Sequence, residues 1–204
     1  RCLAEDENGN EIDGDKIMAI ISNYLRNKGK LAKDTLVATV MSNLGLHKYA
    51  RDNGLELAQT QVGDRYVLEE MLKEGYNLGG EQSGHVILLD YNPTGDGILT
   101  SLMLIQAILE ANKTASQMAE IIKLYPQVLV NAKVNADKKY DYNKDTEIQE
   151  AIEKLEKEFA GNGRVLIRPS GTEPLVRVMI EGEDQEYITK KAKEIADLIE
   201  KKLK

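Results

Sequence analysis

A polar segment near the C-terminal end of the chain carries residue types that bind anions. It reads Arg-Pro-Ser-Gly-Thr-Glu-Pro and begins at Arg168. The Arg168 guanidinium is a planar donor that matches phosphate oxygens two at a time. Ser170 and Thr172 offer hydroxyl donors, and Gly171 allows a ligand to approach the backbone N–H. With Arg177 as a second positive charge, the segment predicts a phosphate site, while the alternative is an ordinary hairpin turn built from common turn residues.

A glycine-rich segment in the first half of the chain carries groups that bind hydroxyls. It reads Gly-Gly-Glu-Gln-Ser-Gly-His and ends at His85. Glu81 accepts hydrogen bonds, Ser83 donates and accepts, and His85 can do either near neutral pH. Three glycines in one short loop predict unusual backbone angles or close approach of a ligand. The mixture suits a polyol such as a sugar, and the alternative is a structural loop with a half-buried histidine.

Four further residues are of types that can take part in chemistry. Asp64 and Arg65 begin an expected helix, where they can serve as cap and salt bridge or as acid/base and charge partners of a substrate. Asp96 lies between two glycines at another helix start, and we expect it to cap that helix rather than to bind a metal. Cys2 is the only cysteine, which excludes an intrachain disulfide and a cysteine-built zinc site and fits a reducing compartment.

The elements that position these segments follow from hydrophobic spacing and turn residues. Strands are expected at 36–40, 55–57, 86–90, 128–134, 164–168 and 175–181, and helices at 15–27, 47–53, 65–74, 94–112, 147–159 and 184–203. A further short helix, capped by Thr114 or Ser116, is expected to end near Leu124. Within the helix at 94–112, a stripe is expected to carry the packing, and its members are Ile98, Leu102, Ile105 and Leu109.

This order of elements predicts two domains. Residues 11–124 form an α/β domain with a mixed, mainly parallel sheet, because strands alternate with helices. Residues 125–204 form a smaller α+β domain, in which an antiparallel sheet is backed by two helices. Residues 1–10 are expected to be a remnant of a preceding domain, with a hairpin around an Asn-Gly turn.

Composition narrows the classes of function. The 204 residues include 27 Lys and Arg against 34 Asp and Glu, for a net charge of −7. An acidic chain with no Trp and one Phe does not predict a nucleic-acid surface, which needs a basic stripe and stacking aromatics. No apolar run is long enough to span a membrane, and no signal peptide opens the chain, so we expect a cytoplasmic protein.

Taken together, the two strongest segments resemble a known family. Gly-Glu-Gln-Ser-Gly-His at 80–85, followed about ninety residues later by Arg-Pro-Ser-Gly-Thr-Glu-Pro, is similar to the α-D-phosphohexomutases. Val-Gly-Asp-Arg-Tyr-Val at 62–67, together with Gln82, resembles the bacterial phosphoglucosamine mutase branch. Relatives that act as phosphomannomutase and phosphoglucomutase usually carry Met where Gln82 stands here.

The resemblance implies a four-domain enzyme that isomerises glucosamine 6-phosphate to glucosamine 1-phosphate. A phosphoserine in the first domain passes its phosphoryl group through a bisphosphate intermediate, and an aspartate loop in the second domain binds Mg²⁺. By this resemblance, Arg1 matches the last residue of that loop, and the serine loop and the metal ligands are absent from this sequence. The chain should therefore bind a phosphosugar without catalysing turnover, and should need the missing N-terminal domains as partners.

The resemblance also assigns roles to residues of this chain. Sugar hydroxyls would be held by Glu81 and Ser83. The candidates for acid/base or charge-stabilising work are Asp64, Arg65, His85 and Arg1. The phosphate that is not transferred would be held by Arg168, Ser170, Gly171, Thr172 and Arg177. Two alternatives stay open, which are a fragment of a phosphomannomutase or phosphoglucomutase and a stand-alone phosphosugar-binding module.

Overall fold

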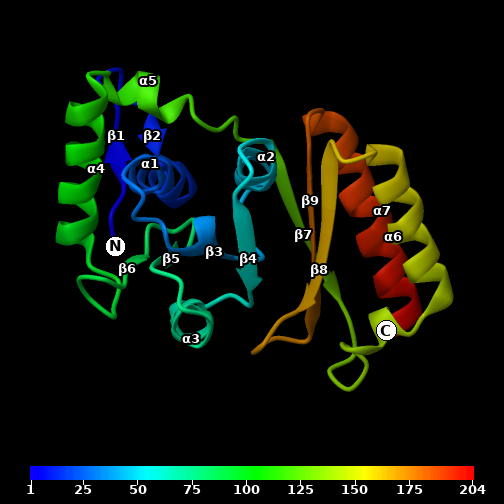
Figure 1. The fold of residues 1–204 in the computed structure, drawn as a ribbon. Helices are drawn as coiled ribbons and strands as arrows, with labels where there is room; N and C mark the ends of the chain where they lie inside the picture. Colours follow the sequence, from blue (N-terminus) through cyan, green and yellow to red (C-terminus); the bar gives the residue numbers. More distant parts are fainter. The chain divides into compact units, whose positions relative to one another are not determined.

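The computed structural model describes residues 1–204 and divides the chain into two units, Arg1–Leu124 and Tyr125–Lys204 (Figure 1). Each unit has its own sheet and its own hydrophobic core. None of the helices combines the length and apolar character that crossing a bilayer requires. The two units are described in turn.

The first unit is built on a four-stranded mixed sheet. Its elements are β1 (Ala4–Glu5), β2 (Glu11–Ile12), α1 (Gly14–Asn27), η1 (Ala32–Asp34), β3 (Thr35–Thr39), α2 (Leu44–Asp52), β4 (Glu56–Thr60), α3 (Asp64–Glu74), β5 (Leu78–Gly80), β6 (Val86–Leu88), α4 (Gly97–Ala111) and α5 (Ala115–Ala119). The strand order is β4-β3-β5-β6, and β3 pairs parallel with both β4 and β5, whereas β6 runs antiparallel to β5. The expected mixed, mainly parallel sheet is confirmed, and β1 and β2 form the expected hairpin.

Helices cover both faces of this sheet. Leu36 and Ala38 of β3 belong to the core shared with α1 and α4, whereas Val37 packs with α3 through Val67 and Met71. All five residues of β3 are buried, as expected for a central parallel strand. The parallel strands β3, β4 and β5 therefore end at one edge of the sheet, where the loops after them gather.

The predicted packing face of α4 is wrong. The side chains of Ile98, Leu102, Ile105 and Leu109 are 51 to 76% exposed, and the helix packs instead through Met103, Leu104 and Ala107 with Thr100. Because α4 is apolar almost all round, spacing alone does not identify its buried side. The helix consequently presents an apolar stripe, Ile98, Leu102, Ile105 and Leu109, to solvent.

The second unit is an antiparallel sheet with helices on one face (Figure 1). Its elements are β7 (Gln127–Lys133), η2 (Asp141–Asn143), α6 (Thr146–Phe159), β8 (Gly163–Pro169), β9 (Leu175–Gly182) and α7 (Gln185–Leu203), with strand order β7-β9-β8. Val176, Val178 and Ile180 of β9 enter the core with α6 and α7. Because side chains alternate along a strand, Arg177 lies on the face that these helices do not cover. The expected α+β arrangement is confirmed.

Candidate functional site

The two arginines of the predicted phosphate site lie directly opposite each other in the second unit. Arg168 of β8 pairs in register with Arg177 of β9, so both side chains share the helix-free face of the sheet. Like charges placed directly across a strand pair destabilise a sheet. Partial burial, and then the neighbouring Arg177 charge, lowers the pKa of Arg168. The hairpin therefore holds two guanidinium groups at a position that disfavours them without an anion.

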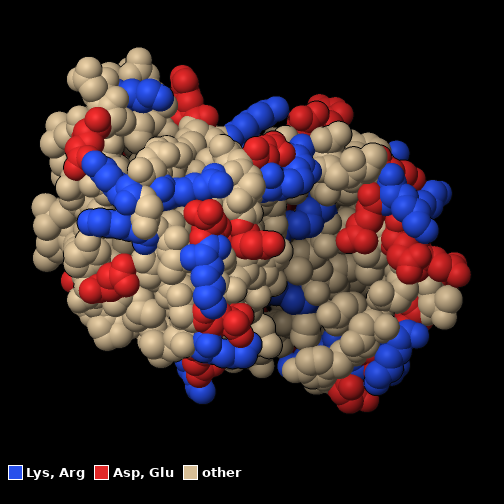
Figure 2. Space-filling view, viewed as in Figure 1, with Lys and Arg blue, Asp and Glu red and all other residues tan.

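The charge around this pair is only partly balanced. Arg177 Nη2 lies 3.5 Å from Glu173 Oε2, an exposed carboxylate, and Arg177 Nε is buried without a hydrogen-bond partner. Figure 2 shows positive and negative side chains interspersed over the viewed face, although the chain carries a net charge of −7. A local positive site can therefore exist on an acidic chain.

The loop between the two arginine strands is held by its own backbone. Ser170 is 3% exposed, its N–H donates to the Leu175 carbonyl at 2.8 Å, and its hydroxyl accepts from the Glu173 N–H at 3.3 Å. Gly171 and Thr172 are exposed at the tip. A Cβ placed on Gly171 would meet no atom within 4 Å, so the loop tip leaves room for a ligand.

The glycine-rich segment is partly a strand rather than a loop. Gly79 and Gly80 belong to β5, and only Gly84 of the three glycines nearest to His85 has a positive φ, of 84°. A Cβ on Gly79 would lie 2.8 Å from Met71 Sδ, and one on Gly80 would lie 2.4 Å from the His85 carbonyl oxygen. The first two glycines are thus required by packing within the sheet, which corrects the expectation of unusual backbone angles there.

Glu81 joins the two predicted segments of the first unit. Its Oε1 accepts a hydrogen bond from the Gly63 N–H at 3.0 Å, which ties the loop after β5 to the loop after β4. Its own N–H donates to the His85 carbonyl at 2.9 Å, and its carbonyl accepts from the Gly84 N–H at 3.0 Å. The carboxylate therefore lies at the junction of both loops, at the carboxyl edge of the parallel strands.

His85 and Asp64 are brought together at the same junction. His85 Nε2 lies 3.3 Å from Asp64 Oδ2, close enough for an ion pair when the ring is protonated, although the two groups are not aligned as a hydrogen bond. The His85 side chain is 19% exposed and that of Asp64 is 60% exposed. Gly95 lies against the ring, because a Cβ there would come within 2.3 Å of Nε2. An imidazole beside a carboxylate can transfer or accept a proton.

The other two candidates for acid/base or charge work make contacts of their own. Arg65 is 80% exposed and pairs with Glu69 at 2.7 Å, and this hydrogen bond raises the pKa of its guanidinium. Arg1 lines an open hollow of about 640 Å³ with the 92–98 loop, and its carbonyl oxygen lies against Gly97. The structure therefore does not bring Arg65 to His85.

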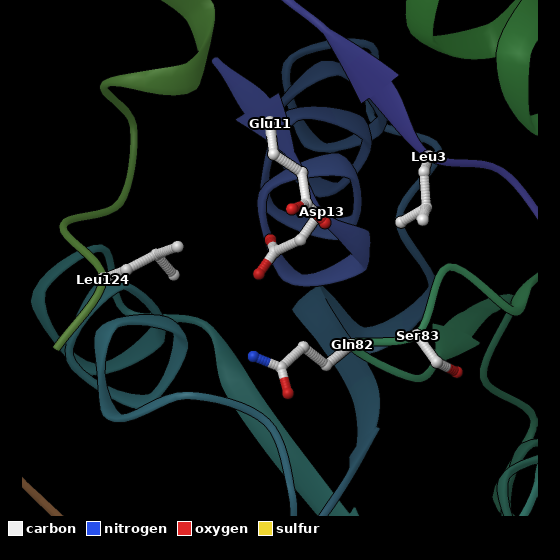
Figure 3. A pocket seen from close by; sticks show the side chains of 6 residues that line it. All are labelled: Leu3, Glu11, Asp13, Gln82, Ser83 and Leu124. Atoms are coloured by element: carbon white, nitrogen blue, oxygen red, sulfur yellow. The ribbon is translucent and has the colours of Figure 1, made fainter. Parts of the chain in front are cut away.

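Ser83 lines a different hollow, of about 380 Å³, in the first unit. Figure 3 shows its lining side chains, which are Leu3, Glu11, Asp13, Gln82, Ser83 and Leu124. The Gln82 side chain extends toward the Asp13 carboxylate and Leu124, whereas the Ser83 hydroxyl points away from them. Asp13 also caps α1, because its Oδ1 accepts from the Lys16 N–H at 3.0 Å. Successive residues of the 81–85 loop thus face different surroundings.

Two contributions were missed from the sequence. Asp13, which precedes the helix expected at 15–27, faces Gln82 in the hollow of Figure 3. Lys139, in the segment after β7, donates from Nζ to the Ser170 carbonyl at 3.0 Å. The strand order β7-β9-β8 places the end of β7 beside the phosphate loop, so the signal for Lys139 was the sheet topology rather than a motif.

The structure contains no group of three or more His, Cys, Asp or Glu side chains that could hold a metal ion. The residues of this chain therefore do not fit a resident metal of their own. Asp96 behaves as a helix cap, as expected, because its Oδ1 accepts from the N–H groups of Ile98 and Leu99 at 3.0 Å.

The chain is similar in sequence to enzymes of one family. It is 58% identical to the phosphoglucosamine mutase of Ruminiclostridium cellulolyticum over 203 residues, which cover 100% of this chain and 45% of that protein. It is 60% identical to the phosphoglucosamine mutase of Caldicellulosiruptor bescii with the same coverage. The chain thus spans less than half the length of these curated relatives.

The fold and the domain models agree with this similarity. The crystal structure of Aspergillus fumigatus N-acetylphosphoglucosamine mutase in complex with GlcNAc-6P and magnesium matches with a TM-score of 0.75 at 21% identity, over 98% of this chain and 46% of that one. The model "Phosphoglucomutase/phosphomannomutase, alpha/beta/alpha domain III" matches residues 13–125, and "Phosphoglucomutase/phosphomannomutase, C-terminal domain" matches residues 129–198. The chain therefore belongs to the phosphoglucomutase/phosphomannomutase family and carries its third α/β/α domain and its C-terminal domain.

Proposed function

We propose that this chain supplies the substrate-binding part of a phosphoglucosamine mutase, an enzyme that interconverts glucosamine 6-phosphate and glucosamine 1-phosphate. The observation that carries the proposal is the opposed pair Arg168 and Arg177 beside an open loop. Of these two guanidinium groups, that of Arg177 lies near one exposed carboxylate, so the pair keeps an excess of positive charge that the anion of a phosphate monoester would balance. The names of relatives at 58 and 60% identity support the choice of the amino sugar.

The second unit would hold the phosphate that is not being transferred. Arg168 and Arg177 would each donate to its oxygens, and the exposed Gly171 N–H and Thr172 hydroxyl would add donors at the loop tip. Phosphoryl transfer depends mainly on positioning and charge stabilisation rather than on covalent help from the protein. A firm grip on the non-reacting phosphate therefore contributes to catalysis by orienting the sugar.

The first unit would bind the sugar hydroxyls. Glu81 has a carboxylate oxygen engaged by Gly63 and further lone pairs for hydroxyl donors. His85 beside Asp64 is the pair placed to exchange a proton with a sugar oxygen, whereas Arg65, paired with Glu69, is the weaker candidate. Ser83 would contribute a hydroxyl from the other side of the same loop. A carboxylate can accept hydrogen bonds from the sugar hydroxyls in either orientation of the sugar. This tolerance is needed if a bisphosphate intermediate turns around in the site.

The phosphoserine and the magnesium would belong to the N-terminal part of the parent enzyme. The A. fumigatus relative was crystallised with magnesium, and no group in this chain suits that ion. The bound ion would supply charge stabilisation for the transferring phosphoryl group. The apolar stripe on α4 supports a partner domain, because four exposed aliphatic side chains in a row are costly in water unless another surface covers them.

A chimera tests this proposal. The chain would replace the matching 203 residues of the R. cellulolyticum enzyme, and turnover would be measured on glucosamine, glucose and mannose 6-phosphates with glucose 1,6-bisphosphate present. We expect turnover by the chimera with preference for glucosamine 6-phosphate, and binding without turnover by the isolated chain. Preference for a neutral hexose would favour a phosphoglucomutase or phosphomannomutase instead. A folded chimera that is inactive on all three substrates, or turnover by the isolated chain, would contradict the proposal.

A further inference from the structure

Lys139 is placed beside the phosphate loop by the pairing of β7. The last residue of β7, Lys133, pairs with Leu175, the first residue of β9, and the next N–H, of Val134, donates to the Pro174 carbonyl at 3.1 Å. The segment after β7 therefore continues alongside the loop that joins β8 to β9. From this segment, Lys139 Nζ reaches the carbonyl oxygen of Ser170 at 3.0 Å.

The turn that carries Lys139 also has anchors outside the phosphate loop. The Asn135 N–H donates to the Leu203 carbonyl at 2.9 Å, and the Asp141 N–H donates to the Lys138 carbonyl at 2.8 Å. The ammonium also lies over the ring of Tyr140, 5.3 Å from its centroid. Lys139 is thus a half-buried cation that contacts a carbonyl oxygen and a ring face rather than a carboxylate.

The contact with Ser170 determines how one peptide plane is turned. No cis peptide bond occurs in the chain, so the Ser170 C=O and the Gly171 N–H point in opposite directions across their shared plane. When Lys139 draws the carbonyl to one side, the Gly171 N–H faces the other side. The Ser170 N–H is already bonded to the Leu175 carbonyl, which fixes the preceding plane, so the Lys139 contact is what orients the next one.

We propose that Lys139 is a positioning residue of the phosphate site, which turns the Gly171 N–H toward the bound phosphate by holding the Ser170 carbonyl. This inference rests on the proposed function, in which Gly171 is a phosphate donor. The ammonium also places a further positive charge beside the loop that joins the strands of Arg168 and Arg177. Pre-oriented donors bind an anion more tightly because no reorganisation is needed when the ligand arrives.

The neighbouring lysine provides a matched control. Lys138 Nζ donates to the Lys204 carbonyl at 3.3 Å, rather than to a carbonyl of the phosphate loop. Lys139→Met removes the charge and the hydrogen-bond donor but keeps an unbranched side chain. Lys138→Met removes a positive charge from the neighbouring residue. Lys139→Arg keeps a charged donor at position 139. Each variant would be titrated with glucosamine 6-phosphate by calorimetry, with the amide resonance of Gly171 followed by NMR in ¹⁵N-labelled chain.

We expect Lys139→Met to raise Kd roughly tenfold, the scale of one lost hydrogen bond to a charged group, and Lys138→Met to change it less than about twofold. Lys139→Arg should recover most of the affinity, and the ligand-induced shift of the Gly171 amide should shrink only in Lys139→Met. Equal losses of affinity in Lys139→Met and Lys138→Met would mean that Lys139 acts only through its charge, and this would overturn the inference. An unchanged Kd for Lys139→Met would overturn it as well. If Arg168→Met also leaves Kd unchanged, or if the unaltered chain does not bind, the phosphate site itself is wrong, and the inference about Lys139 falls with it.

Discussion

Replacing Arg168 should move affinity and stability in opposite directions. Arg168→Met keeps a long unbranched stem and removes one of two guanidinium groups that face each other across β8 and β9. In the free chain these charges repel, and the lowered pKa of Arg168 shows that its environment penalises the charged form. Removing one charge should therefore stabilise the free fold by about 0.2–1 kcal/mol, the range for a cross-strand pair.

The same change should weaken phosphosugar binding. Loss of a hydrogen bond to a charged group costs about 1.5–3 kcal/mol, which corresponds to a Kd roughly 10 to 150 times higher for glucosamine 6-phosphate. Stabilisation by ligand must fall as well. At 100 times the original Kd, the unaltered chain gains about 2.7 kcal/mol from the ligand, and a tenfold weaker variant gains only about 1.4 kcal/mol at the same concentration.

Two measurements on the same protein preparations check the expected loss of affinity and the expected gain in stability. Calorimetric titration gives Kd, and urea unfolding without and with ligand gives the free energy of unfolding in each state. Two outcomes refute the reasoning: an unchanged Kd, or a free variant that loses more than about 1 kcal/mol of stability. The second outcome would mean that the guanidinium holds the hairpin together as a structural group, as in the hairpin-turn alternative.

The remaining predictions concern the pH dependence of stability at Glu110 and the room for a methyl group at two glycines. A hydrogen bond from Lys28, assisted by two neutral donors, lowers the pKa of Glu110 to about 2. The ionised carboxylate therefore contributes fully to the stability of the fold above pH about 4.5, and this contribution is lost as the pH falls toward 2. The difference in urea midpoint between wild type and Glu110→Gln should narrow between pH 6 and 3, and a constant or widening difference would contradict this. Gly79→Ala meets Met71 Sδ at 2.8 Å and should cost about 1–3 kcal/mol in urea unfolding. Gly171→Ala meets nothing within 4 Å and should leave stability within about 1 kcal/mol while raising the calorimetric Kd, and the reverse pattern would refute the assigned roles.

The helix caps were predicted correctly from the sequence, because capping depends on residues that are close together in the chain. Asp96 caps α4 because a short acidic side chain before a helix satisfies the first free N–H groups, and this needs no knowledge of the rest of the fold. Thr114 forms a capping box with Gln117 for the same reason. The strands of the second unit were also predictable, because one face is covered by helices and apolar residues alternate along β9.

Features that depend on tertiary contacts could not be predicted from the sequence. The three-residue strand β5 contains two glycines, which favour a loop by local propensity, and only the close approach of Met71 and the His85 carbonyl explains their presence in a sheet. The stripe on α4 was assigned to the wrong side because apolar residues surround the helix. Lys139 reaches Ser170 through the order of strands, which spacing along the chain does not show.

The candidate phosphate site is best judged against the other end of the same hairpin. Four residues from Arg168, Arg164 pairs in register with Glu181, and its Nη2 lies 2.7 Å from that buried carboxylate. Both pairs project from the same face of β8 and β9, because even spacing along a strand keeps side chains on one side. At one end the arginine therefore has a carboxylate built into the protein, and at the other it faces a second arginine next to an open loop. Since the same two strands accommodate the balanced pair, the unbalanced pair is not a requirement of the sheet. In the proposed function, its repulsion would be relieved when the oxygens of a bound phosphate take the place that Glu181 fills for Arg164.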